Sequence, residues 1–166
     1  LIDSFSKISK DFKDIFLVIA GTGNKEYVKK LKDLIDSAGL NKKIIFVGFV
    51  SHDEKLELLK NAKIFILTSY SDIHPRAIQE ALTMGLPVIC TRVCDYPEID
   101  QYEAGINVEL DVNSIYDAIK NLLENQKTLN LFSKNAKKLI NEKFLLIDQV
   151  KKFEKIYQKS LKIDEK

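Results

Sequence analysis

Five short apolar segments alternate with amphipathic, helix-like segments along this chain, and that alternation limits its fold more than any other feature. Each apolar segment is about as long as a buried parallel strand and shows little polar alternation. These candidate strands are Ile15–Ala20, Lys43–Val50, Lys63–Ser69, Pro87–Thr91 and Gly105–Leu110. The pattern predicts an α/β fold, a doubly wound parallel sheet with helices on both faces. Ligands of such sheets bind at the carboxyl ends of the strands.

The segments between the candidate strands carry helix signals. An apolar stripe over Tyr27–Ala38 is followed by Gly39, a residue suited to ending a helix. Ser51 and Glu54 form an S-x-x-E pattern, which predicts a capping box at the start of a short helix. A turn at Asp111–Ser114 precedes another apolar stripe. The chain therefore reads as one domain of alternating strands and helices.

Composition excludes several other classes of protein. The 166 residues carry a formal net charge of +2, which is too balanced to indicate a nucleic-acid partner. The longest clean apolar run, Ile15–Ala20, is far short of the roughly 20 residues that a membrane span needs. Cys90 and Cys94 lie far in sequence from His52 and His74, so we expect no zinc site. We expect a buried Cys90 on a strand, Cys94 in a loop and a cytoplasmic, reducing location.

Gly21-Thr22-Gly23 directly follows the first candidate strand and precedes a helix. Two glycines let the backbone turn tightly and approach a ligand. The full G-x-G-x-x-G pattern is absent, because Glu26 occupies its last position. A ligand loop and a plain strand-to-helix turn therefore both remain open here.

The segment Ser69–Leu82 is the strongest candidate for a functional site. It leaves a strand, passes through a polar loop, and enters a helix at Pro75, a residue that suits the first helical turn. The free amides of Arg76 and Ala77 would point out of the helix N-terminus. Together with the positive end of the helix dipole they predict a diphosphate site, to which the Arg76 side chain could add a charged contact.

Two acids flank this predicted diphosphate site. Asp72 precedes the helix, and Glu80 lies about five residues into it, with its side chain leaning back toward the N-terminus. Both could accept hydrogen bonds from ligand hydroxyls. Spacing alone equally allows Asp72 to be a helix cap and Glu80 to be a solvated surface residue. His74 fits a polar loop residue better than a catalytic base.

The same stretch resembles the signature of the group 1 glycosyltransferases, retaining enzymes of the GT-B architecture with two Rossmann-like domains. That signature has two acids separated by seven residues, a helix of small residues, and a G-[LIVT]-P-V strand. Asp72 and Glu80 have this spacing, and Gly85–Val88 matches the strand. Further segments match in order, so that the resemblance covers nearly the whole chain: Phe16–Gly23, Ile45–Ser51 and Asp95–Val108.

The resemblance implies roles for individual residues. As catalytic residues it gives Asp72, facing the donor sugar, and Glu80, binding the nucleotide ribose. It also implies nucleotide-sugar-binding positions. Phe49 and Val50 would border the base, and Gly21 and Gly23 would line the cleft. The backbone of Ile73, His74 and Pro75 would face the sugar, and the amides of Arg76 and Ala77 would lie near the diphosphate. One departure is that Asp72 stands where the family mostly has Glu, which shortens the side chain by one methylene.

The resemblance also implies the context of the chain. Residues 1–166 would be a single C-terminal, nucleotide-sugar-binding domain without its first strand, without the basic residues that precede it, and without the acceptor-binding N-terminal domain. A helix at 146–162 would cross toward that domain. The whole enzyme would transfer a hexose with retention in glycan or polysaccharide biosynthesis, with no metal or cofactor. Its acceptor would be a glycan or a lipid-linked sugar, and peripheral membrane association remains open. The isolated chain would be inactive.

Two alternatives remain. A nucleotide-sugar epimerase or a sugar phosphorylase would share the fold and carry its distinguishing residues mainly in the other domain. A non-catalytic signalling module would need an acidic cluster after its first strand and an Asp ending its third. The candidate strands instead end in Gly21, Val50 and Ser69, which disfavours that class.

Overall fold

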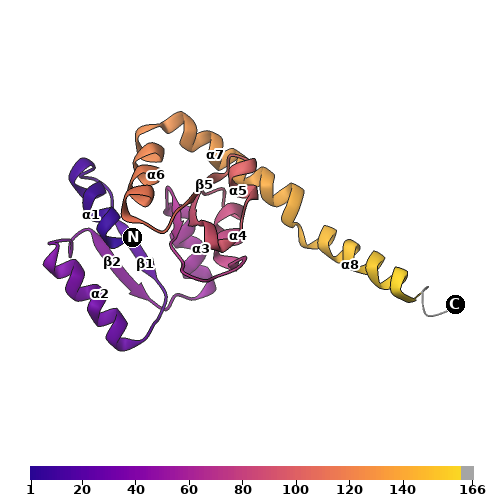
Figure 1. The fold of residues 1–166 in the computed structure, drawn as a ribbon, viewed down its shortest axis with the longest axis horizontal. Coiled ribbons are helices and arrows are strands. Elements are labelled where there is room, and N and C mark those ends of the chain that lie inside the picture. Colours follow the sequence, from indigo (N-terminus) through magenta and orange to yellow (C-terminus); the bar gives the residue numbers. More distant parts are fainter. Residues whose placement is uncertain (162–166) are drawn as a thin grey trace.

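The computed structural model describes residues 1–161, except for the side chains at 146–149, 151, 152, 159 and 161. Strands and helices alternate along the chain (Figure 1). The strands are β1 (Leu17–Ala20), β2 (Ile44–Gly48), β3 (Phe65–Leu67), β4 (Val88–Thr91) and β5 (Gly105–Val108). The helices are α1 (Ile2–Asp11), α2 (Lys25–Ser37), α3 (His52–Asn61), α4 (Arg76–Thr83), α5 (Glu98–Gln101), α6 (Val112–Glu124), α7 (Gln126–Leu139) and α8 (Leu146–Leu161). All five predicted strands are confirmed within the predicted segments.

Every strand pairing is parallel, as the alternation predicts, but hydrogen bonding divides the strands into two sheets. β1 pairs with β2, and β3, β4 and β5 form the second sheet with β4 in the centre. Among the described residues, β1 and β3 each have one edge without a neighbouring strand. The α/β class is confirmed, and the division between β1 and β3 is a feature that the apolar pattern does not predict.

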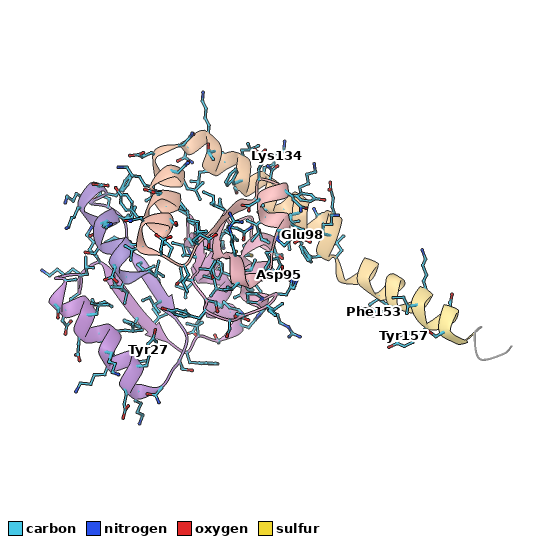
Figure 2. The ribbon with its side chains drawn as sticks, in the orientation of Figure 1. Tyr27, Asp95, Glu98, Lys134, Phe153 and Tyr157 are labelled. Atoms are coloured by element: carbon cyan, nitrogen blue, oxygen red, sulfur yellow. The ribbon has the colours of Figure 1, made fainter. Side chains whose placement is uncertain are left out.

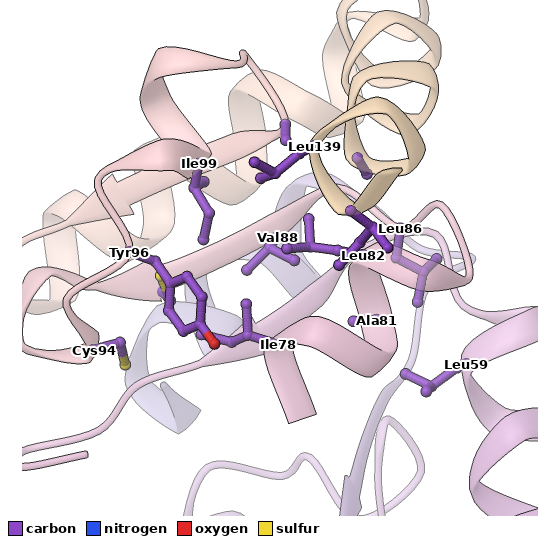
Figure 3. Packing of buried hydrophobic residues seen from close by; sticks show 14 residues of the cluster. Leu59, Ile78, Ala81, Leu82, Leu86, Val88, Cys94, Tyr96, Ile99 and Leu139 are labelled. Carbon is purple, nitrogen blue, oxygen red and sulfur yellow. The ribbon is translucent and has the colours of Figure 1, made fainter. Parts of the chain in front are cut away.

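Two hydrophobic clusters cover opposite faces of the strands. One cluster joins α3, α4, α5 and α7 to β4, and Figure 3 shows Val88 of β4 between Leu82 and Ile99. The other joins α1, α2 and α6 to both sheets, with Ile44 from β2 and Ile89 from β4. In Figure 1, α1 and α6 lie side by side. Successive residues of β4 alternate between the two clusters, so the fold is doubly wound as expected.

The strands differ in how deeply they are buried. All four residues of β4 are buried, as a run without polar alternation predicts. In β1 and β2 every second residue is exposed, including the apolar Val18, Ile45 and Val47. The expectation of buried strands is therefore correct for β4 and wrong for one face of β1 and β2, because no described helix covers that face.

The start of β5 allows only glycine. A Cβ atom on Gly105 would lie 1.9 Å from the carbonyl oxygen of Val88 and 2.9 Å from Cγ2 of Ile99. Both distances are too short for nonbonded atoms, and the Val88 oxygen belongs to the backbone of the neighbouring strand. The close pairing of β4 and β5 therefore depends on the missing side chain at this position.

The helix ends follow the signals in the sequence. Ser51 and Glu54 form the predicted capping box of α3, with both reciprocal hydrogen bonds present. Gly39 follows α2 with a φ of +67°, the left-handed conformation typical of a helix end. Asp111 caps α6 by accepting hydrogen bonds from the amides of Asn113 and Ser114. Local polar residues thus fix where these helices begin and end.

The two cysteines are both buried. Cys90 lies on β4, as predicted, and its Sγ lies 3.1 Å from Oδ1 of Asn107. Burial raises the pKa of the Cys90 thiol to about 12. Cys94, expected in a loop, lies in a single 3₁₀ turn at Arg92–Cys94 and packs into the core. The prediction for Cys94 is therefore correct in placing it after the strand, but the residue is buried.

Helix α8 extends away from the rest of the molecule (Figure 1). Its exposed apolar residues include Val150, Phe153 and Tyr157, and Figure 2 shows the last two on one side of the helix. The side chain of Leu161, the last member of the predicted stripe, lies outside the described residues, and so does residue 162. The crossing to another domain stays a prediction. In the part of the chain that the structure describes, no helix is long and apolar enough to cross a membrane.

Candidate functional site

Four loops at the carboxyl ends of parallel strands carry the predicted site. They follow β1, β2, β3 and β4 at residues 21–24, 49–51, 68–75 and 92–97. Because parallel strands end at the same edge, these loops share one side of the fold. Backbone hydrogen bonds join the loop after β1 to the end of β2 and the loop after β3 to the loop after β4, and the latter two loops also share a ring contact.

The start of α4 presents unpaired backbone donors. Pro75 is the N-cap residue of α4, with φ of −62° and ψ of 129°, so the helix begins one residue later than its sequence suggests. No side chain caps this end. The interpretation of Asp72 as a helix cap is therefore wrong. The amide of Ile78 bonds back to the carbonyl of Pro75, which leaves the amides of Arg76 and Ala77 without a described partner. Such an end attracts anions.

Glu80 lies on the same helix and is not a solvated surface residue. Its Oε1 accepts a hydrogen bond of 2.7 Å from Nζ of Lys55 on α3, and its side chain is 32% exposed. Its other oxygen, Oε2, has no partner among the described residues. The carboxylate is therefore held on one side and available on the other, which is the arrangement that an acceptor of ligand hydroxyl groups needs.

Asp72 and Ile73 form the exposed tip of the loop after β3. Both are exposed, and Asp72 makes no hydrogen bond or ion pair within residues 1–161. The structure thus does not bring the two acids into contact with each other or with a common partner. It leaves Asp72 free to face a ligand and Glu80 fixed beside α3.

His74 is held against the loop after β4. Its amide bonds to the carbonyl of Cys94 at 3.0 Å, and its ring meets that of Tyr96 edge-on at 4.6 Å. Its Nε2 lies 3.9 Å from Oδ2 of Asp95. Both His74 and Asp95 have φ values near +50°, an uncommon conformation for residues with a side chain. Such strained positions concentrate at functional sites, because surrounding contacts must hold them in place.

Gly21 and Gly23 line a cavity of about 810 Å³. Gly21 has a φ of +127°, and its amide bonds to the carbonyl of Gly48 at the end of β2 at 2.7 Å. A side chain there would meet no atom within 4 Å, so the backbone conformation rather than crowding requires glycine. Phe49 and Val50 follow directly after the end of β2, and Phe49 is 79% exposed. Neither lines this cavity, so the structure places them beside it rather than in it.

Three residues near the predicted site lie outside the sequence-based prediction: Lys55, Asp95 and Tyr96. The sequence marks Lys55 only as a residue of the capped helix and Asp95 only as the first residue of the matching segment Asp95–Val108. Tyr96 is almost fully buried, and its hydroxyl lies 3.5 Å from the Pro75 carbonyl. Within the described residues there is no group of three or more His, Cys, Asp or Glu that could hold a metal ion.

Residues 1–139 match the protein family described as glycosyl transferases group 1. The chain belongs to this family. The match covers the five strands and all four site loops, and it ends at the last residue of α7. The signature that carries the resemblance in the sequence therefore lies in a structure with the expected strand and helix order.

This chain is similar in sequence to glycosyltransferases from several organisms. It is 27% identical to an uncharacterized glycosyltransferase of Methanocaldococcus jannaschii, over 96% of this chain and 41% of that protein. It is 26% identical to N-acetyl-alpha-D-glucosaminyl L-malate synthase of Bacillus anthracis, over 99% of this chain and 42% of that protein. The chain thus spans about two fifths of the length of these curated relatives.

Solved structures of group 1 and related glycosyltransferases share the fold. The C-terminal domain of a group 1 glycosyltransferase (LpcC) from Francisella tularensis superposes with a TM-score of 0.76, at 25% identity, over 87% of this chain and 77% of that one. HepE from Anabaena, solved in complex with UDP-glucose, superposes with a TM-score of 0.85 at 19% identity, over 96% of this chain and 44% of that one. The fold is therefore that of a Rossmann-like domain of GT-B glycosyltransferases.

Proposed function

We propose that this chain is the C-terminal, donor-binding domain of a retaining glycosyltransferase. The whole enzyme transfers a hexose from a nucleotide diphosphate sugar to a glycan or a lipid-linked acceptor. One observation carries the proposal: α4 begins with two unpartnered amides, at Arg76 and Ala77, and carries a carboxylate at Glu80 with one free oxygen. An anionic group and a hydroxyl-bearing group, joined as in a nucleotide, match these two features.

The diphosphate is the group that α4 stabilises. As the bond from the sugar to the diphosphate breaks, negative charge grows on the leaving oxygen. Fixed amides and the positive end of the helix dipole lower the energy of that charge without reorganising. The exposed Arg76 adds a charged donor at the same end. With this arrangement the reaction needs no metal ion at the diphosphate, which is part of the proposal.

The remaining groups divide the donor between them. Glu80 accepts hydrogen bonds from the ribose hydroxyls through Oε2. Asp72 and the backbone of Ile73, His74 and Pro75 face the sugar, and the contacts from His74 to Cys94 and Tyr96 hold that loop in place. Gly21 and Gly23 allow close approach of the backbone, and Phe49 and Val50 border the base. We assign no nucleophile.

The acceptor binds outside this chain, in a second domain. The free edges of β1 and β3 support an additional parallel strand between them, and the exposed residues Val18, Ile45 and Val47 support further covering chain. The exposed stripe of α8 supports packing of this helix against the second domain. This division is the expected GT-B arrangement, in which the donor and the acceptor meet between two domains.

The test is donor binding and product analysis on the full-length protein. Isothermal titration with UDP, GDP, ADP and dTDP in the presence of EDTA is expected to show binding of at least one of them. The matching nucleotide sugar and an acceptor are then expected to give a glycoside that keeps the donor's anomeric configuration by NMR. Release of a sugar phosphate from a glycan incubated with inorganic phosphate would indicate a phosphorylase, and an epimerised sugar would indicate an epimerase. Failure to bind any nucleoside diphosphate would overturn the proposal.

A further inference from the structure

Lys55 is in an unusual position for a lysine near a site that binds a nucleotide. It lies on α3, and its Nζ donates to Oε1 of Glu80 on α4 at 2.7 Å, across 25 residues of sequence. Both side chains are about one third exposed, at 34% and 32%. Most other described ion pairs are more exposed, such as Lys60 with Glu57 on the same α3 helix, where both side chains are about two thirds exposed. Lys55 and Glu80 thus form a partly enclosed pair between two helices.

The pair is also the side-chain link that joins α3 to α4. Within residues 1–161, no other side-chain hydrogen bond or ion pair connects α3 to a different element. The apolar contact of α3 with the rest of the core runs through Leu59, one turn further along. Lys55 is therefore the polar side-chain contact that links the first turn of α3 to α4 among the described residues.

The start of α3 is itself tied to the proposed base site. Ser51 caps α3 in a capping box and directly follows Phe49 and Val50. Lys55 is four residues from Ser51, and the amide of Lys55 bonds to the Ser51 carbonyl at 3.0 Å. A rigid path thus runs from the segment beside the base, through the first turn of α3, to the carboxylate proposed for the ribose.

A carboxylate on a flexible side chain has several rotamers, and only some of them direct an oxygen toward a ligand. By occupying Oε1, Lys55 selects one arrangement and leaves Oε2 as the free acceptor. We infer that Lys55 is a positioning residue, which orients Glu80 toward the ribose hydroxyls and fixes its distance from the base-binding segment. This inference rests on the proposed function, because it requires a nucleotide in the site.

The experiment compares a nucleoside diphosphate with its 2′,3′-dideoxy analogue, which lacks the hydroxyl groups that Glu80 would bind. The nucleoside diphosphate used is the one that the full-length protein binds most tightly. Affinities are measured by titration calorimetry for the wild-type protein and for Glu80→Gln, Lys55→Met and Lys55→Arg. Lys60→Met is the matched control, because it removes a lysine from the same helix that pairs only with its neighbour Glu57. Thermal unfolding of each variant confirms that it folds.

We expect the wild-type protein to prefer the ribonucleotide and Glu80→Gln to lose most of that preference. Lys55→Met is expected to reduce the preference by about threefold or more, because residues in direct contact are energetically coupled. Lys55→Arg is expected to retain much of the preference for the ribonucleotide, and Lys60→Met is expected to leave that preference unchanged. A simple structural role would weaken both ligands equally and leave the preference as it was.

The possible failures are distinguishable. If Glu80→Gln loses the preference and Lys55→Met keeps it, the proposed ribose role stands and the positioning role is overturned. Equal weakening of both ligands by Lys55→Met overturns it as well, because a purely structural role of Lys55 has that effect. If Glu80→Gln keeps the full preference, the ribose role in the proposed function is wrong, and the positioning role is overturned with it.

Discussion

The change Glu80→Gln tests the proposed site most directly. The substitution keeps the size and shape of the side chain and removes its charge. Among the described residues Glu80 accepts one hydrogen bond, from Lys55 to Oε1, and its Oε2 has no partner. The change therefore affects two things: the ion pair with Lys55 and the proposed hydrogen bonds from the ribose hydroxyls. The two effects differ in size and are measured separately.

The effect on stability should be small. Both members of the ion pair are about one third exposed, so solvent screens their attraction. Pairs at or near the surface contribute about 0–1 kcal/mol, and glutamine can still accept a hydrogen bond from Lys55. We expect the free energy of unfolding to fall by less than about 1 kcal/mol. Chemical denaturation with urea measures it, and Glu57→Gln on α3 is the matched control, since it changes an exposed acid without a proposed ligand.

The effect on binding should be larger. A hydrogen bond to a charged group contributes about 1.5–3 kcal/mol, which corresponds to a loss of affinity of roughly ten- to 150-fold for the nucleoside diphosphate. Titration calorimetry on the full-length protein measures it. Equal affinities of the wild-type and the Glu80→Gln proteins would refute the ribose role. A loss of affinity that matches a large loss of stability would show instead that the variant is damaged.

Three further predictions follow from other parts of the molecule. Asp72→Asn should leave the affinity for the free nucleoside diphosphate almost unchanged and lower turnover of the complete donor, because Asp72 is proposed to contact only the sugar. Equal weakening of both ligands would contradict this. The pKa of Cys90 is raised from 9.0 to about 12, so the unfolded chain loses its proton first and the free energy of unfolding should fall as the pH rises from 9 toward 12, by at most about 1.4 kcal/mol per unit. Cys90→Ala should flatten that slope, and an unchanged slope would contradict the assignment. Gly105→Ala should destabilise the protein by about 1–3 kcal/mol or more, because its Cβ would overlap the Val88 carbonyl. Unaltered thermal unfolding would show that the strand can move aside.

The parts of the fold that could be predicted are those that local sequence determines. β4 is a run of apolar residues between turns, and such a run can only be buried on both faces. Ser51, Glu54, Gly39 and Asp111 act on backbone groups within four residues of themselves. Their effects are visible in sequence because the interacting groups are close in sequence.

The division of the sheet could not be predicted in the same way. The apolar runs at β1 and β3 have the composition of strands, whether or not a neighbour lies on each edge. Which strands pair depends on how the connecting helices pack, and α3, which joins β2 to β3, has no pattern that fixes its position. The exposure of Val18 and Val47 could not be predicted either, since a sequence shows which residues are apolar but not whether a chain that covers that face of the sheet is nearby.

The candidate site shows the same limit at the level of side chains. The location of Glu80 near the start of α4 was predictable, because Pro75 and Glu80 are five residues apart at the start of one helix. Its partner Lys55 was not, because the two residues meet across 25 positions and only the packing of α3 on α4 brings them together. The left-handed conformations of His74 and Asp95 depend in the same way on two loops that bond to each other. Asp is one of the few residues with a side chain that adopt this conformation readily, and Asp95 adopts it here. The contact between these two loops places Oδ2 of Asp95 3.9 Å from Nε2 of His74, in the loop that is proposed to face the sugar.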